Sequence, residues 1–185
     1  MSDARRGIGA VLLAVTLASS VGAVGMAAPQ APTESPIMDA TKAATFCADG
    51  EERAFLQLIN NYRASYRLPA LRFSRTLGAA ADHHSNQMAK NNYFSHTMLH
   101  GVTWSRNIVD HGYGFVTSKG ENIAAGRASA ADTFSQWRNS PDHNAIMLSP
   151  SFTAIGIGRG YDASSTYDWY WTTDFGGIFD AGLAC

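Results

Sequence analysis

Apolar side chains recur at intervals of three and four residues through the middle of the chain, which is the spacing of amphipathic helices. The first such stretch follows Asp49 and ends near residues 68–69, and the second lies between Ser74 and the pair Asn91-Asn92. Three shorter helices are expected after these, because each pattern begins or ends at a capping residue. They cover residues 103–111 closed by Gly112, a segment begun by Ser129 that buries Phe134 and Trp137, and a segment from Ser140-Pro141 to Leu148.

The last third of the chain changes to a period of two, which predicts strands over residues 152–160 and 167–175. Only residues 161–166 separate them, so a hairpin is expected. Gly156 and Gly158 leave one face of the first strand without side chains, and this predicts close approach by another part of the molecule. Helices followed by an antiparallel pair indicate an α+β domain rather than a series of βαβ units.

The first residues have the pattern of an export signal. Arg5 and Arg6 precede a long uncharged apolar run that ends in small residues, so residues 1–28 are expected to be a cleaved signal peptide. An uncleaved membrane anchor is the alternative, because the run is also about long enough to span a bilayer. Residues 29–46, rich in proline, are expected to be a linker or a disordered mature N-terminus, and residues 47–185 the folded domain. The mature protein should therefore be secreted and have no stable membrane span.

Composition narrows the class of protein further. The chain has 185 residues, of which 45% are hydrophobic and 16% charged, and this suits one globular domain with a real core. The net charge is −1 at pH 7. Loss of two arginines and one aspartate with the signal peptide makes the mature chain slightly more acidic, so we expect no nucleic-acid partner. We expect a monomer.

The two cysteines, Cys47 and Cys185, are expected to form a disulfide, because thiols in one small exported domain usually pair. Such a bond would close nearly the whole domain into one loop and remove on the order of 4 kcal/mol of unfolded-chain entropy. Two free thiols are the alternative. Nothing near either residue resembles the base of a cysteine nucleophile.

Common catalytic and binding motifs are absent from the sequence. It has no Gly-x-Ser-x-Gly elbow, no His-Glu-x-x-His helix, no phosphate-binding loop and no EF-hand loop. A few acid–base residues remain, and we expect them at the ends of elements: His96 after the second helix, Glu121 within residues 119–123, and His143 after Pro141-Asp142.

Four segments in order around these residues resemble the CAP superfamily, the group of cysteine-rich secretory, antigen 5 and pathogenesis-related 1 proteins that is also called the SCP domain. The bacterial branch is the closer likeness. The likeness runs from about Glu52 to Gly176, nearly all of the mature chain. Each segment alone would be weak, but four in order are specific. The segments are Phe94-Ser95-His96-Thr97, residues 120–126, residues 137–148 and residues 170–176.

This resemblance implies a three-layer α-β-α sandwich around a small antiparallel sheet, with a cleft that typically holds two histidines and two acids. His96 and His143 match the two histidines, and Glu121 matches the acid of the Gly-Glu-Asn motif. The second acid usually stands three residues after a tryptophan, here Trp137, where this chain has Ser140 instead. The expected cleft is therefore lined by His96, Glu121, Ser140 and His143, and a mechanism that needs all four family residues is in doubt.

Two imidazoles near a carboxylate suit Zn²⁺ or a similar divalent cation, although two protein ligands give only weak binding. We expect His96 and His143 to bind the cation and Glu121 to orient a ring or a bound water. The alternative is a hydrogen-bonded polar cluster with a purely structural role.

Two functions follow from this site. The first is a secreted binding module for a small hydrophobic (lipid), cell-wall or protein ligand. The second is a weak metal-dependent hydrolase (protease, esterase or nuclease), with Glu121 as the candidate catalytic residue. The missing acid and the lack of an obvious nucleophile favour binding, and whether the protein is an enzyme stays open.

The other four histidines have simpler interpretations. His84 lies on the inner face of the second helix and is expected to be a satisfied core residue, whereas His83 should be solvated. His100 is expected in a loop, and His111 at a helix C-terminus, where positive charge is favourable.

Overall fold

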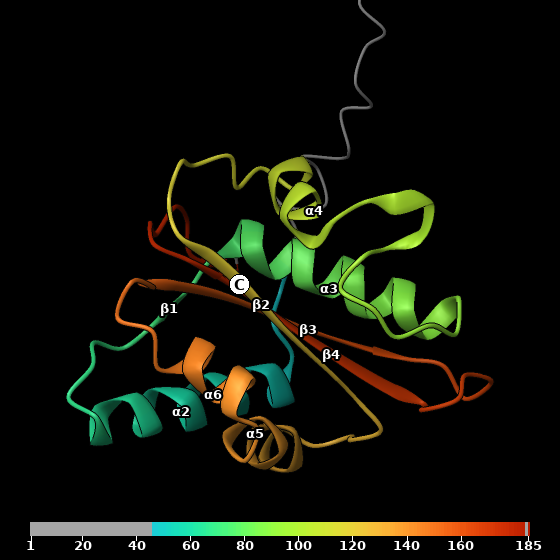
Figure 1. Cartoon of the computed structure of the whole chain (residues 1–185), viewed down its shortest axis with the longest axis horizontal. Coiled ribbons are helices and arrows are strands. Elements are labelled where there is room, and N and C mark those ends of the chain that lie inside the picture. Colours follow the sequence, from blue (N-terminus) through green and yellow to red (C-terminus); the bar gives the residue numbers. More distant parts are fainter. Residues whose placement is uncertain (1–45, 184) are drawn as a thin grey trace, which may run out of the picture. The chain divides into compact units, whose positions relative to one another are not determined.

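The computed structural model describes residues 46–183 and residue 185, which form one three-layer domain. The predicted signal peptide and residues 29–45 of the predicted linker lie outside the described residues. The middle layer is one four-stranded sheet in the order β1-β3-β4-β2 (Figure 1). Its strands are β1 (Arg72–Phe73), β2 (Lys119–Ala125), β3 (Ala154–Tyr161) and β4 (Trp169–Gly176). The β3–β4 hairpin is confirmed: β4 pairs antiparallel with both β3 and β2, and the short β1 joins β3 in parallel.

Helices cover both faces of this sheet. α3 (Arg75–Lys90) and α4 (Trp104–Asp110) lie on one side. α2 (Gly50–Ser65), α5 (Ala130–Arg138) and α6 (Pro141–Met147) lie on the other, as Figure 1 shows. A short 3-10 turn, Leu99–Gly101, precedes α4. The α+β class and the α-β-α sandwich expected from the sequence are therefore confirmed, with β1 making the small sheet mixed.

Local sequence sets the helix ends. Asp49 and Glu52 form a capping box at the start of α2, each side chain accepting the other's backbone N–H at 2.8 Å. Ser74, Thr103 and Ser129 cap α3, α4 and α5 through their side-chain oxygens. Because these residues satisfy backbone groups left over at the helix ends, the sequence alone predicted all five α-helices of the described part.

The bare face of β3 receives α3. A Cβ atom added at Gly156, Gly158 or Gly160 would overlap the backbone of α3, near Leu77, Asp82 and Ser85 respectively. Ser85 also donates from its hydroxyl to the Gly158 carbonyl oxygen at 2.9 Å. The predicted close approach is confirmed, and it is the reason that α3 lies directly against the sheet.

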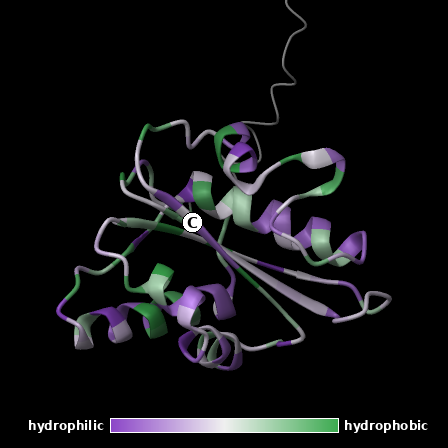
Figure 2. Ribbon diagram, in the orientation of Figure 1, coloured by the Kyte–Doolittle hydropathy of each residue, from purple (hydrophilic) through white to green (hydrophobic). Residues whose placement is uncertain are grey.

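The main core lies between the sheet and the α2–α5–α6 layer. Trp137 of α5 and Trp171 of β4 are fully buried there, and Phe55 of α2 contacts both rings. The ring of Phe152 packs on Phe175, with centroids 5.3 Å apart. Figure 2 shows the corresponding mixture of hydrophobic and hydrophilic residues along the helices, as expected for helices with one buried face.

Strand β2 was not predicted. We expected Glu121 at the end of an element, but it lies inside this strand, where Glu121 pairs with Asp174 and Asn122 with Thr173. Both Glu121 and Asn122 are buried. Two adjacent polar residues in a short segment conceal the strand pattern, because their partners come from distant parts of the chain.

The two ends of the domain are joined. The predicted disulfide Cys47–Cys185 is present and links residues 138 positions apart. Phe46, expected in the linker, is instead buried against Ala79 and stacks on Phe73 at 6.1 Å between ring centroids. No helix of the described residues has the length and apolar character needed to span a membrane.

Candidate functional site

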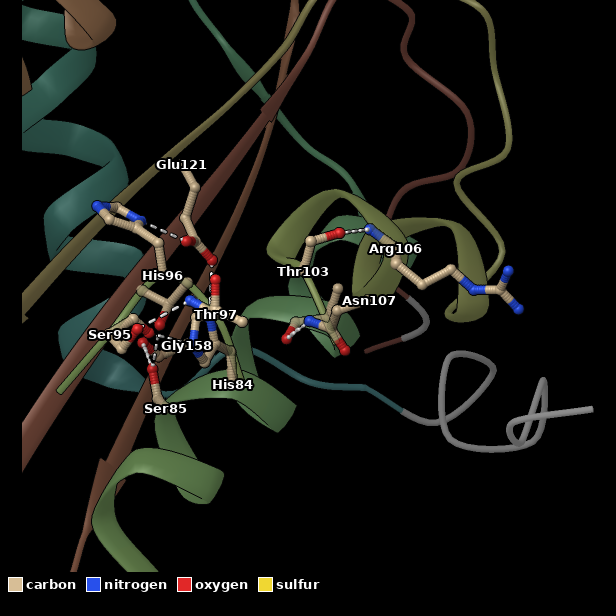
Figure 3. Close-up of polar contacts among 12 residues, drawn as sticks. His84, Ser85, Ser95, His96, Thr97, Thr103, Arg106, Asn107, Glu121 and Gly158 are labelled. Carbon is tan, nitrogen blue, oxygen red and sulfur yellow. Dashed lines mark hydrogen bonds and ion pairs between the residues drawn. The ribbon is translucent and has the colours of Figure 1, made fainter. Parts of the chain in front are cut away.

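Glu121 is at the centre of the candidate site. Its side chain is 1% exposed, and its two carboxylate oxygens contact two different histidines. Oε2 lies 2.6 Å from Nδ1 of His84, and Oε1 lies 2.7 Å from Nδ1 of His96. Figure 3 shows the carboxylate between the two rings. Strand β2 therefore holds one buried acid against residues of α3 and of the segment that follows it.

His84 is fully buried on the face of α3 that meets the sheet. Its Nε2 lies 3.0 Å from the backbone oxygen of Ser95, which only accepts hydrogen bonds, so Nε2 carries a proton. Its Nδ1 faces the Glu121 carboxylate. Each nitrogen of this fully buried ring therefore has a polar partner, the Ser95 backbone oxygen or the Glu121 carboxyl. The prediction of a satisfied core histidine is confirmed, but its partner could not be predicted.

His96 is the exposed member of the group. Its side chain is 52% exposed, and Nδ1 donates to Glu121. This hydrogen bond raises the pKa of His96 above the ordinary histidine value, against the opposing effect of burial. The other ring nitrogen, Nε2, is directed away from Glu121 in Figure 3. Glu121 thus orients the ring and leaves one nitrogen for a ligand.

His143 comes from α6, on the opposite layer. Its Nδ1 lies 2.7 Å from Oγ of Ser140, and its ring stacks on Trp137 with centroids 6.0 Å apart. Burial lowers the pKa of His143, and the nearby charge of His96 lowers it further. The charge of His96 therefore reaches His143, although 47 positions separate the two residues in the sequence.

Ser140 stands where the family motif usually has an acid, and its side chain contacts His143. It is the N-cap residue of α6, but its hydroxyl makes no capping hydrogen bond and is paired with His143 instead. A hydroxyl can orient an imidazole without adding a negative charge. The site therefore has a lower anionic charge than a two-acid site at the same position would have.

A second buried acid, Asp174, was not predicted. It is fully buried in β4, directly across the strand pair from Glu121, and neither of its oxygens has a hydrogen-bond partner among the described residues. Burial raises the pKa of Asp174 well above its ordinary value, and the charge of Glu121 adds to the effect. Burial thus favours the neutral form of Asp174. A charged residue type inside an aromatic strand was the only signal of it in the sequence.

The described residues offer few ligands for a cation. No group of three or more His, Cys, Asp or Glu side chains in the described part of the chain is arranged to hold a metal ion. The four predicted cleft residues line neither of the two cavities found beside α3. What the geometry offers is two imidazoles with one oriented nitrogen each, a set that needs water to complete any coordination shell.

The remaining histidines lie apart from Glu121. His100 is in the 3-10 turn with a positive φ of 61° and is exposed, as expected for a loop residue. His111 is the C-cap residue of α4, as predicted, and its ring lies 5.0 Å from that of His83. His83, expected to be solvated, is half-buried.

Comparison with known proteins defines the class. Residues 56–175 match the model of the cysteine-rich secretory protein family (CAP). The match covers well over half of the chain, so the protein belongs to the CAP family. The resemblance inferred from the sequence motifs is confirmed.

Individual relatives agree with this assignment. The chain is 30% identical over 149 residues to the uncharacterized protein YkwD of Bacillus subtilis, and it spans about half of that protein (55%) and 80% of its own length. An extracellular SCP-domain protein from Bacillus anthracis superposes with a TM-score of 0.61 at 30% identity, over 71% of this chain and 41% of that one. An outer surface protein of Borrelia burgdorferi has the same fold, with a TM-score of 0.63 at 21% identity over 71% of this chain and 95% of its own.

Proposed function

We propose that this CAP domain is an exported binding module whose site at His96 and His143 takes a divalent cation weakly, with Zn²⁺ the best match. The observation that carries the proposal is the double engagement of Glu121. Because both of its oxygens accept hydrogen bonds from histidines, Glu121 acts as an orienting group beside the cation site. An imidazole that donates Nδ1–H to a carboxylate offers its Nε2 as a fixed and more basic ligand.

The wider ligand is proposed from the same features. The protein carries a predicted export signal, and its relatives include one described as extracellular and one as an outer surface protein. We propose that the domain presents this site outside the cell to a lipid, a cell-wall component or a protein. Native mass spectrometry of the exported protein would detect a ligand that is carried through purification.

Isothermal titration calorimetry with Zn²⁺ at neutral pH tests the cation site. Wild-type protein should give weak, saturable heat, and His96→Ala and His143→Ala should each abolish it. Glu121→Gln should weaken binding roughly tenfold to a hundredfold, the usual effect of losing such an orienting partner. His100→Ala is the matched control, since this histidine is exposed and makes no contact with Glu121. Unchanged heats in both His96→Ala and His143→Ala would reject the site.

The hydrolase alternative has less support. A general base must present a lone pair to the water it activates. Glu121 is almost fully buried and already accepts two hydrogen bonds, so it is poorly placed for this task. Turnover of peptide, ester and nucleic-acid substrates with added Zn²⁺ tests the alternative directly. Activity that disappears in folded Glu121→Gln would establish catalysis and overturn the binding proposal.

A further inference from the structure

A cavity of about 580 Å³ lies on the far side of α3 from His84, between that helix, the N-terminal end of α2 and the outer edge of β3. Its volume is within the range of small-molecule sites, roughly 300–1,000 Å³. The site of His96 and Glu121 contributes no residue to it. The residues that line it and carry the argument are Asp49, Asp82, Asn86, Gln87, Lys90 and Arg159.

The charges on the cavity wall balance. Arg159 forms an ion pair with Asp49, and the side chains of Asp82 and Lys90 add one charge of each sign. Glu52 also faces the cavity, but burial raises its pKa to about 8, so it is largely uncharged at neutral pH. A wall of this kind matches a polar ligand without net charge better than a phosphate or a polycation.

Side-chain amides on α3 are held in place for such a ligand. Asn86 donates from Nδ2 to the backbone oxygen and the carboxylate of Asp82, and Asn91 donates in the same way to Gln87. These hydrogen bonds hold two consecutive side-chain amides of α3, Asn86 and Gln87, each against a partner one helical turn away, and both amides line the cavity. They leave Oδ1 of Asn86 to accept and Nε2 of Gln87 to donate, the complementary pair that adjacent hydroxyl groups require.

Two aromatic rings outside the cavity lining, those of Tyr161 and Trp169, adjoin Arg159. The Arg159 guanidinium lies 4.7 Å from the ring centroid of Trp169, and the Tyr161 ring is also 4.7 Å from that of Trp169. Residues 159 and 161 of one strand point to the same side, the face of β3 away from α3, so Tyr161 lies next to Arg159, the residue of β3 that lines the cavity. Tyr161 is 52% exposed. The exposed Tyr161 ring, beside Trp169, offers a flat surface on which the C–H face of a sugar ring can stack.

We propose that this cavity, with the adjoining Tyr161–Trp169 pair, binds a neutral saccharide. Asn86, Gln87 and Asp82 would take its hydroxyl groups, and Tyr161 would stack on a neighbouring sugar ring. The site is separate from the cation site, so it adds a function to the domain and does not depend on the one proposed above.

Titration of the ¹⁵N-labelled mature chain with chitotriose and with maltotriose, followed by NMR, tests the proposal. Binding of either sugar should shift the amide signals of Asn86 and Gln87 and the indole signal of Trp169. Tyr161→Ala and Gln87→Ala should each weaken it about fivefold, the loss expected for one ring contact or one hydrogen bond. Tyr66→Ala is the matched control, because Tyr66 is equally exposed but lies at the other end of α2.

Two further experiments test which form of saccharide binds and whether binding is independent of the cation site. Co-sedimentation with insoluble chitin distinguishes a polymeric glycan from a free oligosaccharide, and either source supports the proposal. Affinity for the sugar should be unchanged in His96→Ala, so failure of the cation site does not affect this result. No shift up to millimolar sugar, shifts confined to His96 and His143, or tighter binding of a sulfated tetrasaccharide would each overturn the proposal.

Discussion

Glu121 of β2 and Asp174 of β4 lie directly opposite each other in antiparallel register, both buried, and among the described residues only Glu121 has side-chain hydrogen-bond partners. Two adjacent buried acids cannot both be ionised without a large cost. The histidines give Glu121 its hydrogen-bond partners, whereas burial raises the pKa of Asp174 and so favours its neutral form. This difference between the two acids should appear in the pH dependence of stability.

Replacement of Asp174 by Asn should be tolerated at acidic pH and stabilising at alkaline pH. The pKa of Asp174 is raised on folding, so its contribution to stability is complete below the unfolded value of about 3.9 and is lost as pH rises through the folded value. Asn has no proton to lose. Urea unfolding at pH 5 and pH 9 should show that the free energy of unfolding of Asp174→Asn increases relative to that of the wild type as pH rises. A constant difference between the two proteins would contradict the assignment of a neutral Asp174.

Removal of His84 should destabilise the domain by about 3 kcal/mol, because His84→Ala leaves the buried Glu121 carboxyl without one of its two hydrogen-bond partners. His100→Ala, at an exposed histidine, should change the free energy of unfolding by less than about 0.5 kcal/mol. Long-range ¹H–¹⁵N spectra of the wild type should also show a proton on Nε2 of His84, the nitrogen that faces the Ser95 backbone oxygen. An unprotonated Nε2 would contradict the hydrogen bond from His84 to Ser95.

Stability should also fall between about pH 5 and pH 9 because of Glu52. Burial raises the pKa of Glu52 from 4.5 to about 8, although the backbone N–H groups of Asp49 and Arg159 donate to its carboxylate and act in the opposite direction. Its stabilising contribution is therefore complete below about pH 4.5 and lost as pH rises through about 8. Each pKa unit corresponds to about 1.4 kcal/mol.

The Glu52→Gln variant should have a flatter dependence of stability on pH than the wild type. Asp142→Asn, at an exposed acid in the first turn of α6, serves as the control and should keep the wild-type slope. Thermal unfolding across this pH range measures both. Equal slopes for Glu52→Gln and wild type would show that Glu52 is ionised in the folded protein.

The disulfide should stabilise the domain mainly by restricting the conformations of the unfolded chain. A bond between residues 138 positions apart restricts nearly the whole domain, and the double variant Cys47→Ala/Cys185→Ala should lose about 4 kcal/mol. The folded structure should survive, since the main core around Trp137 contains neither cysteine. Each single variant should lose as much as the double variant. Additive losses would indicate packing effects of the two side chains in place of the cross-link.

Much of the fold could be predicted because the sequence signals for its helices and for the hairpin are local. The capping residues Asp49, Ser74 and Ser129 lie within a few positions of the groups they satisfy, and the alternation in β3 and β4 is visible along the strand itself. Strand β2 was missed for the opposite reason. Its two polar residues are paired with β4, α3 and α6, and nothing next to them in the sequence signals those partners.

The sequence by itself determined the family, the helices, the hairpin, the disulfide and three residues of the site, His96, Glu121 and His143. Only the tertiary structure decided how these residues are used. His84 reaches Glu121 because the glycine face of β3 lets α3 lie directly against the sheet, and Asp174 faces Glu121 because of the β2–β4 register. Both relationships join segments far apart in the chain, where burial and strand pairing, and not local preference, set the distance and the charge.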